Sequence, residues 1–278
     1  MDPTNDKYKR TGHNFLLIFL NSTSYYIIAF LFLYLLAQFA TAIAAMQFNF
    51  SSIIFYHKLV WTIDSGSWTS DAVKLLYSLP PFISLLFGFF FLLIFISIYD
   101  HRSKFKMFFM WTFAHGMIWF FGALLAGTIL DKGFGYVVMY FYFLDTGKLI
   151  LSLISLTLLL TVSTITTKWF LFSGNSYFNQ LNEHNRTFFT FSQIILPFVA
   201  GTAILIGIKL PLITYYELFV LLSSLLFMLP IMMRYNSMPT FFFDELPIKI
   251  KPDIKAMVVA VLLLAAYRVV LEMGIRIY

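Results

Sequence analysis

The chain has 278 residues, of which 60% are hydrophobic and only 12% are charged. A soluble domain carries about 25% charged residues, so this chain has too little polar surface to cover a water-soluble globule. The net charge of +6 is typical of basic loops beside a membrane, so we expect no nucleic-acid partner, and the absence of cysteine excludes disulfides and thiolate metal sites.

The apolar residues occur in long continuous blocks, and the mean hydropathy is +0.83. Several blocks reach the roughly 20 residues that a helix needs to cross a bilayer core. Because apolar and polar residues do not alternate along these blocks, a transmembrane β-barrel is excluded. The sequence therefore predicts an all-α polytopic transmembrane helix bundle, with a single membrane domain over residues 1–278. We expect an integral membrane protein of the bacterial cytoplasmic (inner) membrane.

About seven spans are predicted along the chain. The first is long and has no cleavage-like end, so it is interpreted as a retained span and not as a removed signal peptide. Pro80 and Pro81 are expected in the first turn of the second span, where proline is tolerated. The aromatic segment 137–144 is too short to cross alone, and it either lies in the interface or dips into the membrane and returns. The spans cover about residues 15–46, 80–99, 107–130, 145–167, 191–208, 215–233 and 256–275.

The Lys and Arg residues outside the spans predict the orientation. With the N-terminus inside, the inner segments hold twelve of these residues and the outer segments hold six. Cytoplasmic loops carry the excess of Lys and Arg in membrane proteins. The N-terminus is therefore predicted inside and the C-terminus outside.

Polar and ionisable residues are concentrated in the stretch 114–148. His115 lies inside an apolar run, and Asp145 and Lys148 open the next one. These three residues form a candidate functional polar cluster, because an ionisable group in the hydrocarbon needs a partner or a wet cavity. The structural alternatives are a hydrogen bond from His115 to another helix and an N-cap role for Asp145.

Two further features concern the helices themselves. Arg268 and Glu272 are four residues apart on the seventh span, which predicts an intramembrane ion pair on one helix face. Glu217 stands in the first turn of the sixth span, where the helix dipole favours an anion. Small residues in the third span predict close helix packing, and these are Gly122, Ala123, Ala126 and Gly127.

Two stretches resemble the site-2 intramembrane zinc proteases. F-L-D-T-G-K-L-I-L-S-L (residues 143–153) is similar to the L-D-G-G-R/K element of that family, in which the Asp is the third zinc ligand. A-Q-F-A-T-A-I-A-A (residues 37–45) has the frame of the family's H-E-x-x-H-A-x-A-A helix. The resemblance implies that Asp145 occupies the ligand position and meets the 37–45 helix near the outer side.

The metal-binding side chains of that family are replaced in this chain. Two histidines four residues apart share a helix face and reach one Zn²⁺, while the glutamate activates water. Ala37 and Thr41 stand at the histidine positions and Gln38 at the glutamate position, and none of them supplies a nitrogen ligand or a base. We therefore expect no metal, no cofactor and no catalytic residue.

Three functions remain open from the sequence. Missing motifs and short loops favour a non-catalytic subunit or scaffold of a membrane complex, with the bilayer and other membrane subunits as partners and a zinc-less site-2-protease-like fold. The alternative is a divergent intramembrane enzyme, a protease or a lipid-modifying enzyme, that uses His115 and Asp145, with His57 as a further candidate. A transporter is the third, although no internal repeat is visible.

Overall fold

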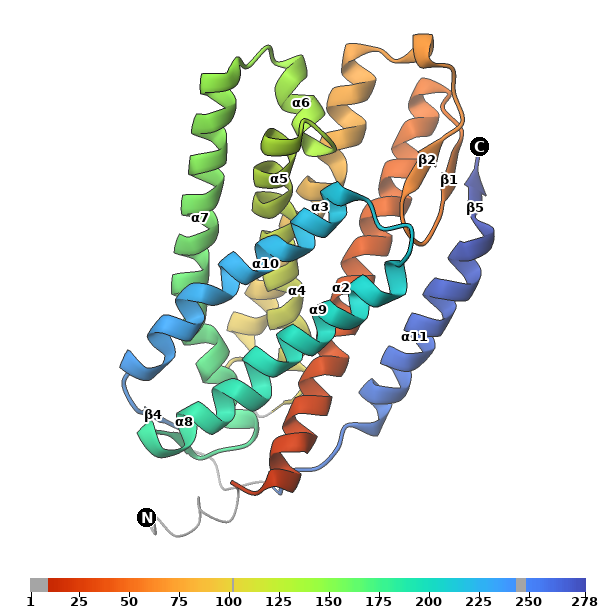
Figure 1. Ribbon diagram of the computed structural model, residues 1–278. Helices are drawn as coiled ribbons and strands as arrows, with labels where there is room; N and C mark the ends of the chain where they lie inside the picture. The colour runs from red at the N-terminus through yellow and green to blue at the C-terminus, as the bar shows by residue number, and fades with distance from the viewer. Residues whose placement is uncertain (1–9, 102, 244–248) are drawn as a thin grey trace.

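The structure is a computed structural model that describes residues 10–101, 103–243 and 249–278. Seven helices in this part of the chain are long and apolar enough to cross a membrane. They run beside one another as a single bundle (Figure 1). The predicted all-α polytopic bundle is confirmed. The spans cover Gly12–Phe48, Ser70–Ser97, Lys106–Leu130, Asp145–Ser176, Glu183–Lys209, Tyr215–Ser237 and Ile254–Met273.

Five of the spans are single α-helices, three of them with a short 3₁₀ turn at the C-terminal end. They are α2 (Gly12–Ala45) with η1 (Met46–Phe48), α3 (Ser70–Ser97), α7 (Asp145–Phe172) with η4 (Ser173–Ser176), α10 (Tyr215–Arg234) with η6 (Tyr235–Ser237), and α11 (Ile254–Met273).

Two spans contain a π-helical segment between two α-helices. The segments are α4 (Lys106–Met117), η3 (Ile118–Gly122) and α5 (Ala123–Leu130), and then α8 (Glu183–Thr190), η5 (Phe191–Ile195) and α9 (Leu196–Lys209). A π segment breaks the regular hydrogen-bond ladder and changes the direction of the helix that follows. Each span therefore changes direction at its π segment, and its two halves can contact neighbouring helices that one straight helix could not contact along its whole length.

The first, third, sixth and seventh spans begin and end close to their predicted bounds, but the second span does not. α3 begins at Ser70 and not near residue 80, so Pro80 and Pro81 lie inside the helix. The Thr69 hydroxyl caps the helix by accepting the N–H of Ala72 at 3.2 Å. The prediction used the length of the apolar run, which covers only the part of the helix that is compatible with hydrocarbon. The helix itself begins earlier in the sequence, at the residue that caps it.

The loop predicted over residues 168–189 is also shorter than expected. α7 continues to Phe172, and the fifth span begins at Glu183 and not near residue 191. Asn182 caps this span with a reciprocal capping box, since its side chain accepts from Asn185 N–H and the Asn185 side chain accepts from Asn182 N–H. This polar first turn of α8 lies before the apolar run from which the span was predicted.

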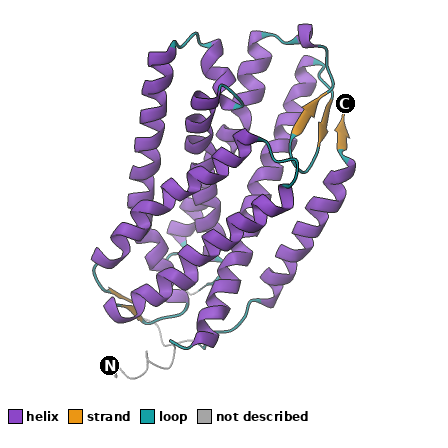
Figure 2. Cartoon of the chain, viewed as in Figure 1, coloured by secondary structure: helices purple, strands orange, loops and turns teal. Residues whose placement is uncertain are grey.

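Two small antiparallel sheets close opposite ends of the bundle (Figure 2). The connection after α2 forms a hairpin of β1 (Ser52–Ile54) and β2 (Leu59–Trp61), followed by η2 (Ser65–Ser67), and β5 (Ile275–Ile277) pairs with β1. At the other end, β3 (Gln180–Leu181) pairs with β4 (Phe241–Phe242). None of these strands is evident from the sequence pattern, because each is only two or three residues long.

The aromatic segment 137–144 does not cross the bundle. Its first residues belong to α6 (Phe134–Tyr140), a short helix that packs against α3 and α5. A Cβ on Gly135 would lie 2.0 Å from the carbonyl oxygen of Gly127, so the two backbones touch at these glycines. The chain then turns at Tyr142, which has a φ of +58°, before α7 begins.

The first and last described elements lie at opposite ends of the bundle, as an odd number of spans requires. α2 begins at the lower end in Figure 1 and β5 ends at the upper end.

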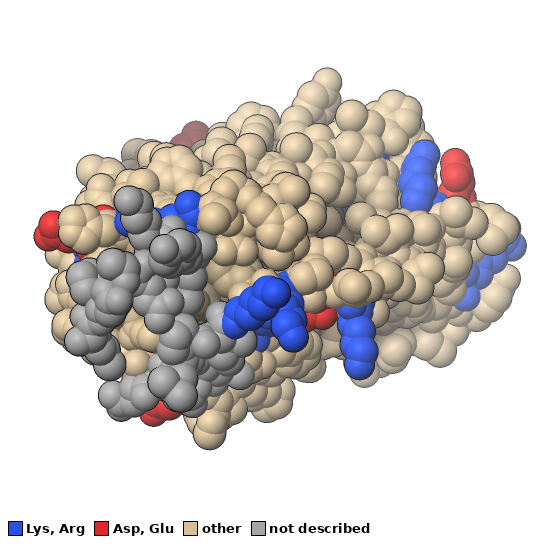
Figure 3. All heavy atoms as spheres, turned by 90° about the horizontal axis from the view of Figure 1, so that it is seen from below, with Lys and Arg blue, Asp and Glu red and all other residues tan. Residues whose placement is uncertain are grey.

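Seen from the lower end, basic and acidic side chains lie scattered on a surface that is mostly uncharged (Figure 3). At this end Lys104 donates to the carbonyl of Lys251. Burial lowers the pKa of Lys104 below its usual value.

The helices α3 and α4 cross with their backbones in close contact. A Cβ on Gly116 would lie 2.4 Å from the carbonyl oxygen of Ser84 and 2.9 Å from the Cα of Gly88. Small residues allow such close backbone contact where helices have no hydrophobic drive to associate. Around this crossing the core is largely aromatic, with Tyr26 and Trp111 in edge contact at 4.9 Å between ring centroids.

We predict that Gly116→Ala lowers the thermal stability of the purified protein in detergent. The added methyl group meets backbone atoms of α3 that cannot rotate away, and overpacking of this kind costs roughly 1–3 kcal/mol. Gly207→Ala is the matched control, because a Cβ there meets nothing within 4 Å. The melting temperature of both variants is measured by fluorescence-detected size exclusion after heating. Equal melting temperatures for Gly116→Ala and Gly207→Ala would show that α3 and α4 can move apart at this crossing without loss of stability.

Candidate functional site

A buried ion pair joins the end of α9 to the start of α10. Lys209 is the last residue of α9 and Glu217 lies in the first turn of α10. The Lys209 Nζ atom is 3.2 Å from Glu217 Oε2, and the two side chains are 0% and 9% exposed. A cation is favoured at a helix C-terminus and an anion at a helix N-terminus. The short connection between the two helices therefore places each charge where its own helix stabilises it.

The pair does not satisfy all of its hydrogen-bonding groups. Within the described residues, neither Lys209 Nζ nor Glu217 Oε2 has a hydrogen-bond partner of good geometry, although 3.2 Å is an ion-pair distance. At 3.2 Å the two charges still attract each other strongly, because Coulomb attraction does not require an aligned N–H bond. The Lys209 ammonium also lies 3.7 Å from the centroid of the Tyr34 ring, a cation–π contact.

Two tyrosines tie this pair to the helices on either side. The Tyr34 hydroxyl, from α2, donates to Glu217 Oε1 at 3.0 Å. Tyr267, from α11, lies 6.0 Å from Tyr34 between ring centroids, and its hydroxyl donates to the carbonyl of Tyr56 in the hairpin. Four helices and the β1–β2 hairpin therefore meet around Glu217.

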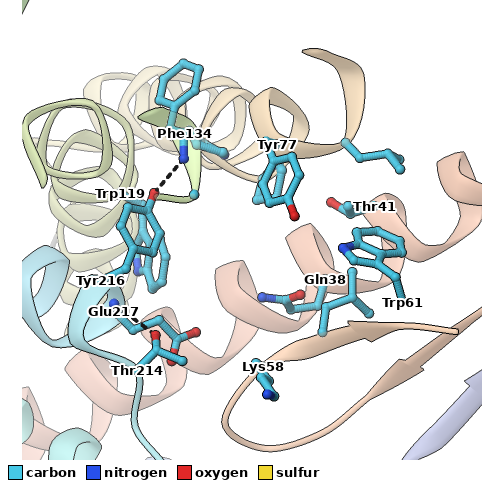
Figure 4. Close-up of a pocket in the computed structure, with 15 residues that line it drawn as sticks. Gln38, Thr41, Lys58, Trp61, Tyr77, Trp119, Phe134, Thr214, Tyr216 and Glu217 are labelled. Carbon is cyan, nitrogen blue, oxygen red and sulfur yellow. Dashed lines mark hydrogen bonds between the residues drawn. The ribbon is translucent and has the colours of Figure 1, made fainter. Parts of the chain in front are cut away.

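A pocket of about 190 Å³ opens beside Glu217. We call it the Glu217 pocket. Its walls come from α2, the hairpin, α3, η3, the turn before α6 and the start of α10. Five aromatic residues line it, and they are Trp61, Tyr77, Trp119, Phe134 and Tyr216. The polar lining residues are Gln38, Thr41, Lys58, Thr214 and Glu217, and Figure 4 shows the Tyr77 hydroxyl and the Gln38 amide directed into the space between the walls.

The mouth of the pocket is electropositive. Lys58 is exposed at this edge. Burial, and then the positive charges of Lys58, Lys209 and Arg268, lower the pKa of the neighbouring His57. Of the lining residues, Lys58 carries the positive charge for which the described residues form no ion pair.

The three residues of the predicted polar cluster have different surroundings in the structure. His115 is buried, and its Nε2 lies 3.2 Å from the carbonyl oxygen of Tyr26 on α2. Lys148 donates instead to Asp131, at the end of α5, at 2.6 Å. Asp145 is exposed at the start of α7. Within the described residues, no group of three or more His, Asp or Glu side chains is placed to hold a metal ion.

The N-cap prediction for Asp145 is wrong by one position. Leu144 occupies the N-cap with extended backbone, and its side chain makes no capping bond. Asp145 is the first helical residue, where its charge still interacts favourably with the helix dipole.

The other predicted residues lie where their spacing suggested. Arg268 Nη2 is 3.8 Å from Glu272 Oε1, with side chains 32% and 62% exposed. Gly122 packs against α10, where an added Cβ would lie 1.9 Å from Ser223 Oγ, and Gly127 packs against α6. Ala123 and Ala126 are buried in the same span.

The two stretches that resemble a zinc protease lie on different sides of the bundle. Ala37, Gln38 and Thr41 are on α2, which packs against α3, α4, α9 and α11. Asp145 opens α7, which packs against α5 and α10, at the opposite edge of Figure 1. Gln38 and Thr41 line the Glu217 pocket, and Asp145 does not. The family relationship itself stays a prediction.

Sequence reasoning missed the buried pair and the pocket. The sequence predicts Glu217 in a first turn, but no pattern along the chain indicates that it pairs with Lys209. The feature of the sequence that could have indicated the pair is the very short connection between the fifth and sixth spans. It brings Lys209, at the end of one helix, close to Glu217, at the start of the next.

We predict that Glu217→Gln destabilises the protein strongly, because it leaves the Lys209 charge buried without its counter-ion. Breaking a buried pair costs about 3–5 kcal/mol. The double variant Lys209→Met/Glu217→Gln should be less destabilised than the sum of the single variants, since neither charge then remains. Unfolding free energies of the four proteins in one detergent give the coupling.

Glu272→Gln is the matched control, since Glu272 belongs to an exposed pair and exposed pairs contribute little. Equal losses for Glu217→Gln and Glu272→Gln would contradict the role assigned to the buried pair.

Comparison with known proteins assigns no family. No protein-family model matches the chain, and neither a curated protein nor a solved structure matches it. What the protein does has to be inferred from the buried pair, the pocket and the outward faces of the helices.

Proposed function

We propose that the protein is a non-catalytic multi-pass membrane protein that serves as a subunit or scaffold of a membrane complex. The use of its buried cations supports this proposal. Lys106 is fully buried and donates to the carbonyl of Tyr99 at 2.6 Å and to Asn175 Oδ1 at 2.8 Å. It joins the start of α4 to the chain that follows α3 and to η4.

Arg186 has a similar structural use. It is buried in α8, and its guanidinium donates to the carbonyls of Asn236 and Pro239, each at 2.9 Å. These carbonyls belong to the segment after α10, where the helix leaves its last acceptors unpaired. Both cations thus hold helix ends together within the chain and are used for its own packing.

The observation that carries the proposal is the outward face of α7. This helix lies at the edge of the bundle (Figure 1) and packs against α5 and α10. Thr157 and Thr161 are exposed on its outer side, and their hydroxyls donate to the carbonyls of Leu153 and Thr157, each at 2.8 Å. Small side chains with satisfied hydroxyls let the backbone of a second helix approach closely, so the partner we propose is a transmembrane helix of another subunit.

We also propose a bacterial inner membrane, with the end where α2 begins facing the cytoplasm. The excess of Lys and Arg in the segments predicted inside supports this orientation. Lys104 lies between α3 and α4, Lys168 lies near the C-terminal end of α7, and Arg234 is the last residue of α10. These helix ends lie at the lower end of Figure 1.

The test is a photo-cross-link from a single engineered cysteine, since the natural chain has none. Thr161→Cys is labelled in native membranes with a benzophenone maleimide. We expect one discrete adduct with another membrane protein, and we expect that protein to co-purify in fixed ratio with the unlabelled chain in mild detergent.

The matched control is Leu86→Cys on α3, because Leu86 is 68% exposed and its apolar surroundings suit lipid equally well. It should give lipid adducts alone. The proposal is wrong if both positions yield the same products, or if the chain purifies as a monomer in every mild detergent.

A further inference from the structure

The Glu217 pocket contains hydroxyl groups with unused hydrogens. Thr214 Oγ accepts the N–H of Glu217 at 3.2 Å, and the Tyr216 hydroxyl accepts the N–H of Phe134 at 3.2 Å (Figure 4). In the described part of the chain, neither hydroxyl donates a hydrogen bond in turn. A hydroxyl carries one donor as well as its acceptor lone pairs. Each of these groups therefore has a hydrogen available to a ligand.

Other lining groups add donors. The Tyr77 hydroxyl and the Gln38 amide are directed into the pocket (Figure 4). The Lys58 ammonium stands at the edge, and among the described residues it forms no ion pair. An ammonium offers three donors and no acceptor. The pocket therefore complements a ligand that accepts hydrogen bonds.

The one acid on the wall does not reverse this preference. Glu217 Oε1 already accepts from Tyr34, and Glu217 Oε2 lies 3.2 Å from Lys209. Its charge is compensated inside the protein, so it does not call for a cationic ligand. The net charge left on the lining is the positive charge of Lys58, which favours an anionic group.

The rest of the lining is apolar, and the pocket lies near the ends of the helices that form it. Trp61, Trp119 and Pro81 contribute large apolar faces. The pocket lies where α2 nears its end at Ala45 and where α10 begins at Tyr215. Helix ends of this kind meet the boundary between hydrocarbon and headgroups, where tryptophan is enriched. An anionic head and an apolar chain together suit this lining.

We propose that the Glu217 pocket binds the carboxylate of a long-chain fatty acid. The Tyr77 hydroxyl and the Gln38 amide, which are directed into the space (Figure 4), donate hydrogen bonds to the carboxylate, and the Lys58 ammonium at the edge attracts it. The first part of the chain lies between Trp61 and Trp119. This site is independent of the partner face on α7, so either proposal can fail without the other.

The test uses quenching of tryptophan fluorescence in a non-ionic detergent. 9,10-Dibromostearate should quench saturably, because two of the five tryptophans line the pocket. The dibrominated alcohol of the same chain keeps the apolar part and lacks the charge, and it should quench without saturation. Lys58→Gln removes the attracting charge and Tyr77→Phe removes one charge-assisted hydrogen bond, so each should weaken binding of the acid about tenfold.

Lys74→Gln and Tyr140→Phe are the matched controls, since both residues lie outside the lining. They should bind like the natural protein. Unlabelled stearate should also raise the melting temperature of the natural protein, because a ligand of the folded state stabilises it. This second readout does not depend on any variant folding.

Three outcomes would overturn the proposal. The acid and the alcohol quench alike, or both pocket variants bind the acid like the natural protein. In the third, butanoate or inorganic phosphate competes with dibromostearate as well as stearate does, which would make the site a receptor for a free anion and not for an amphiphile.

Discussion

A charge buried inside a protein must be matched by another group, because moving it out of water without a partner is costly. In this bundle Lys209 and Glu217 meet that requirement together, and the structure around them follows from it. Their helices must end and begin at the same depth. Tyr34 then brings α2 to the carboxylate, and Tyr267 brings α11 and the hairpin to Tyr34. This group of polar contacts thus fixes the relative depth of four helices. Leucine side chains that face lipid cannot do so, because they are equally favourable at any depth in the hydrocarbon.

The existence of the spans could be predicted from the sequence, but their true starts could not. Hydropathy records which residues suit hydrocarbon, whereas a helix starts where a cap supplies its first acceptor, as Thr69 and Asn182 do here. The same limit explains the ion pairs. Arg268 and Glu272 were visible because four residues is the spacing of one helix face, yet they form the exposed pair. Lys209 and Glu217 belong to two helices, so no periodicity reveals them.

The candidate site could not be predicted for a related reason. The Glu217 pocket is lined by residues from segments as far apart in sequence as Gln38 and Glu217. Thr41 stands on this wall with its hydroxyl donated to the carbonyl of Ala37, one turn earlier. The small side chains of the 37–45 stretch, which suggested a resemblance to a zinc protease helix, leave room here between α2 and the hairpin. The sequence of one helix shows which of its side chains are small. Whether the space beside them is filled depends on the segments that pack against that helix.

The pocket wall and the outward helix α7 are held by one turn. Asp131 ends α5 with a φ of +51° and accepts from Lys148 of α7 at 2.6 Å. Two residues later, Gly133 has a φ of +57°, and a Cβ there would lie 2.3 Å from the Tyr216 ring. Only glycine allows this backbone beside the ring at low cost. The ring is held from the other side as well, because its hydroxyl accepts the N–H of Phe134. A displacement of α7 that moved Lys148 would act on the same three-residue turn that positions the Tyr216 wall, so the two surfaces are mechanically connected although they share no residue.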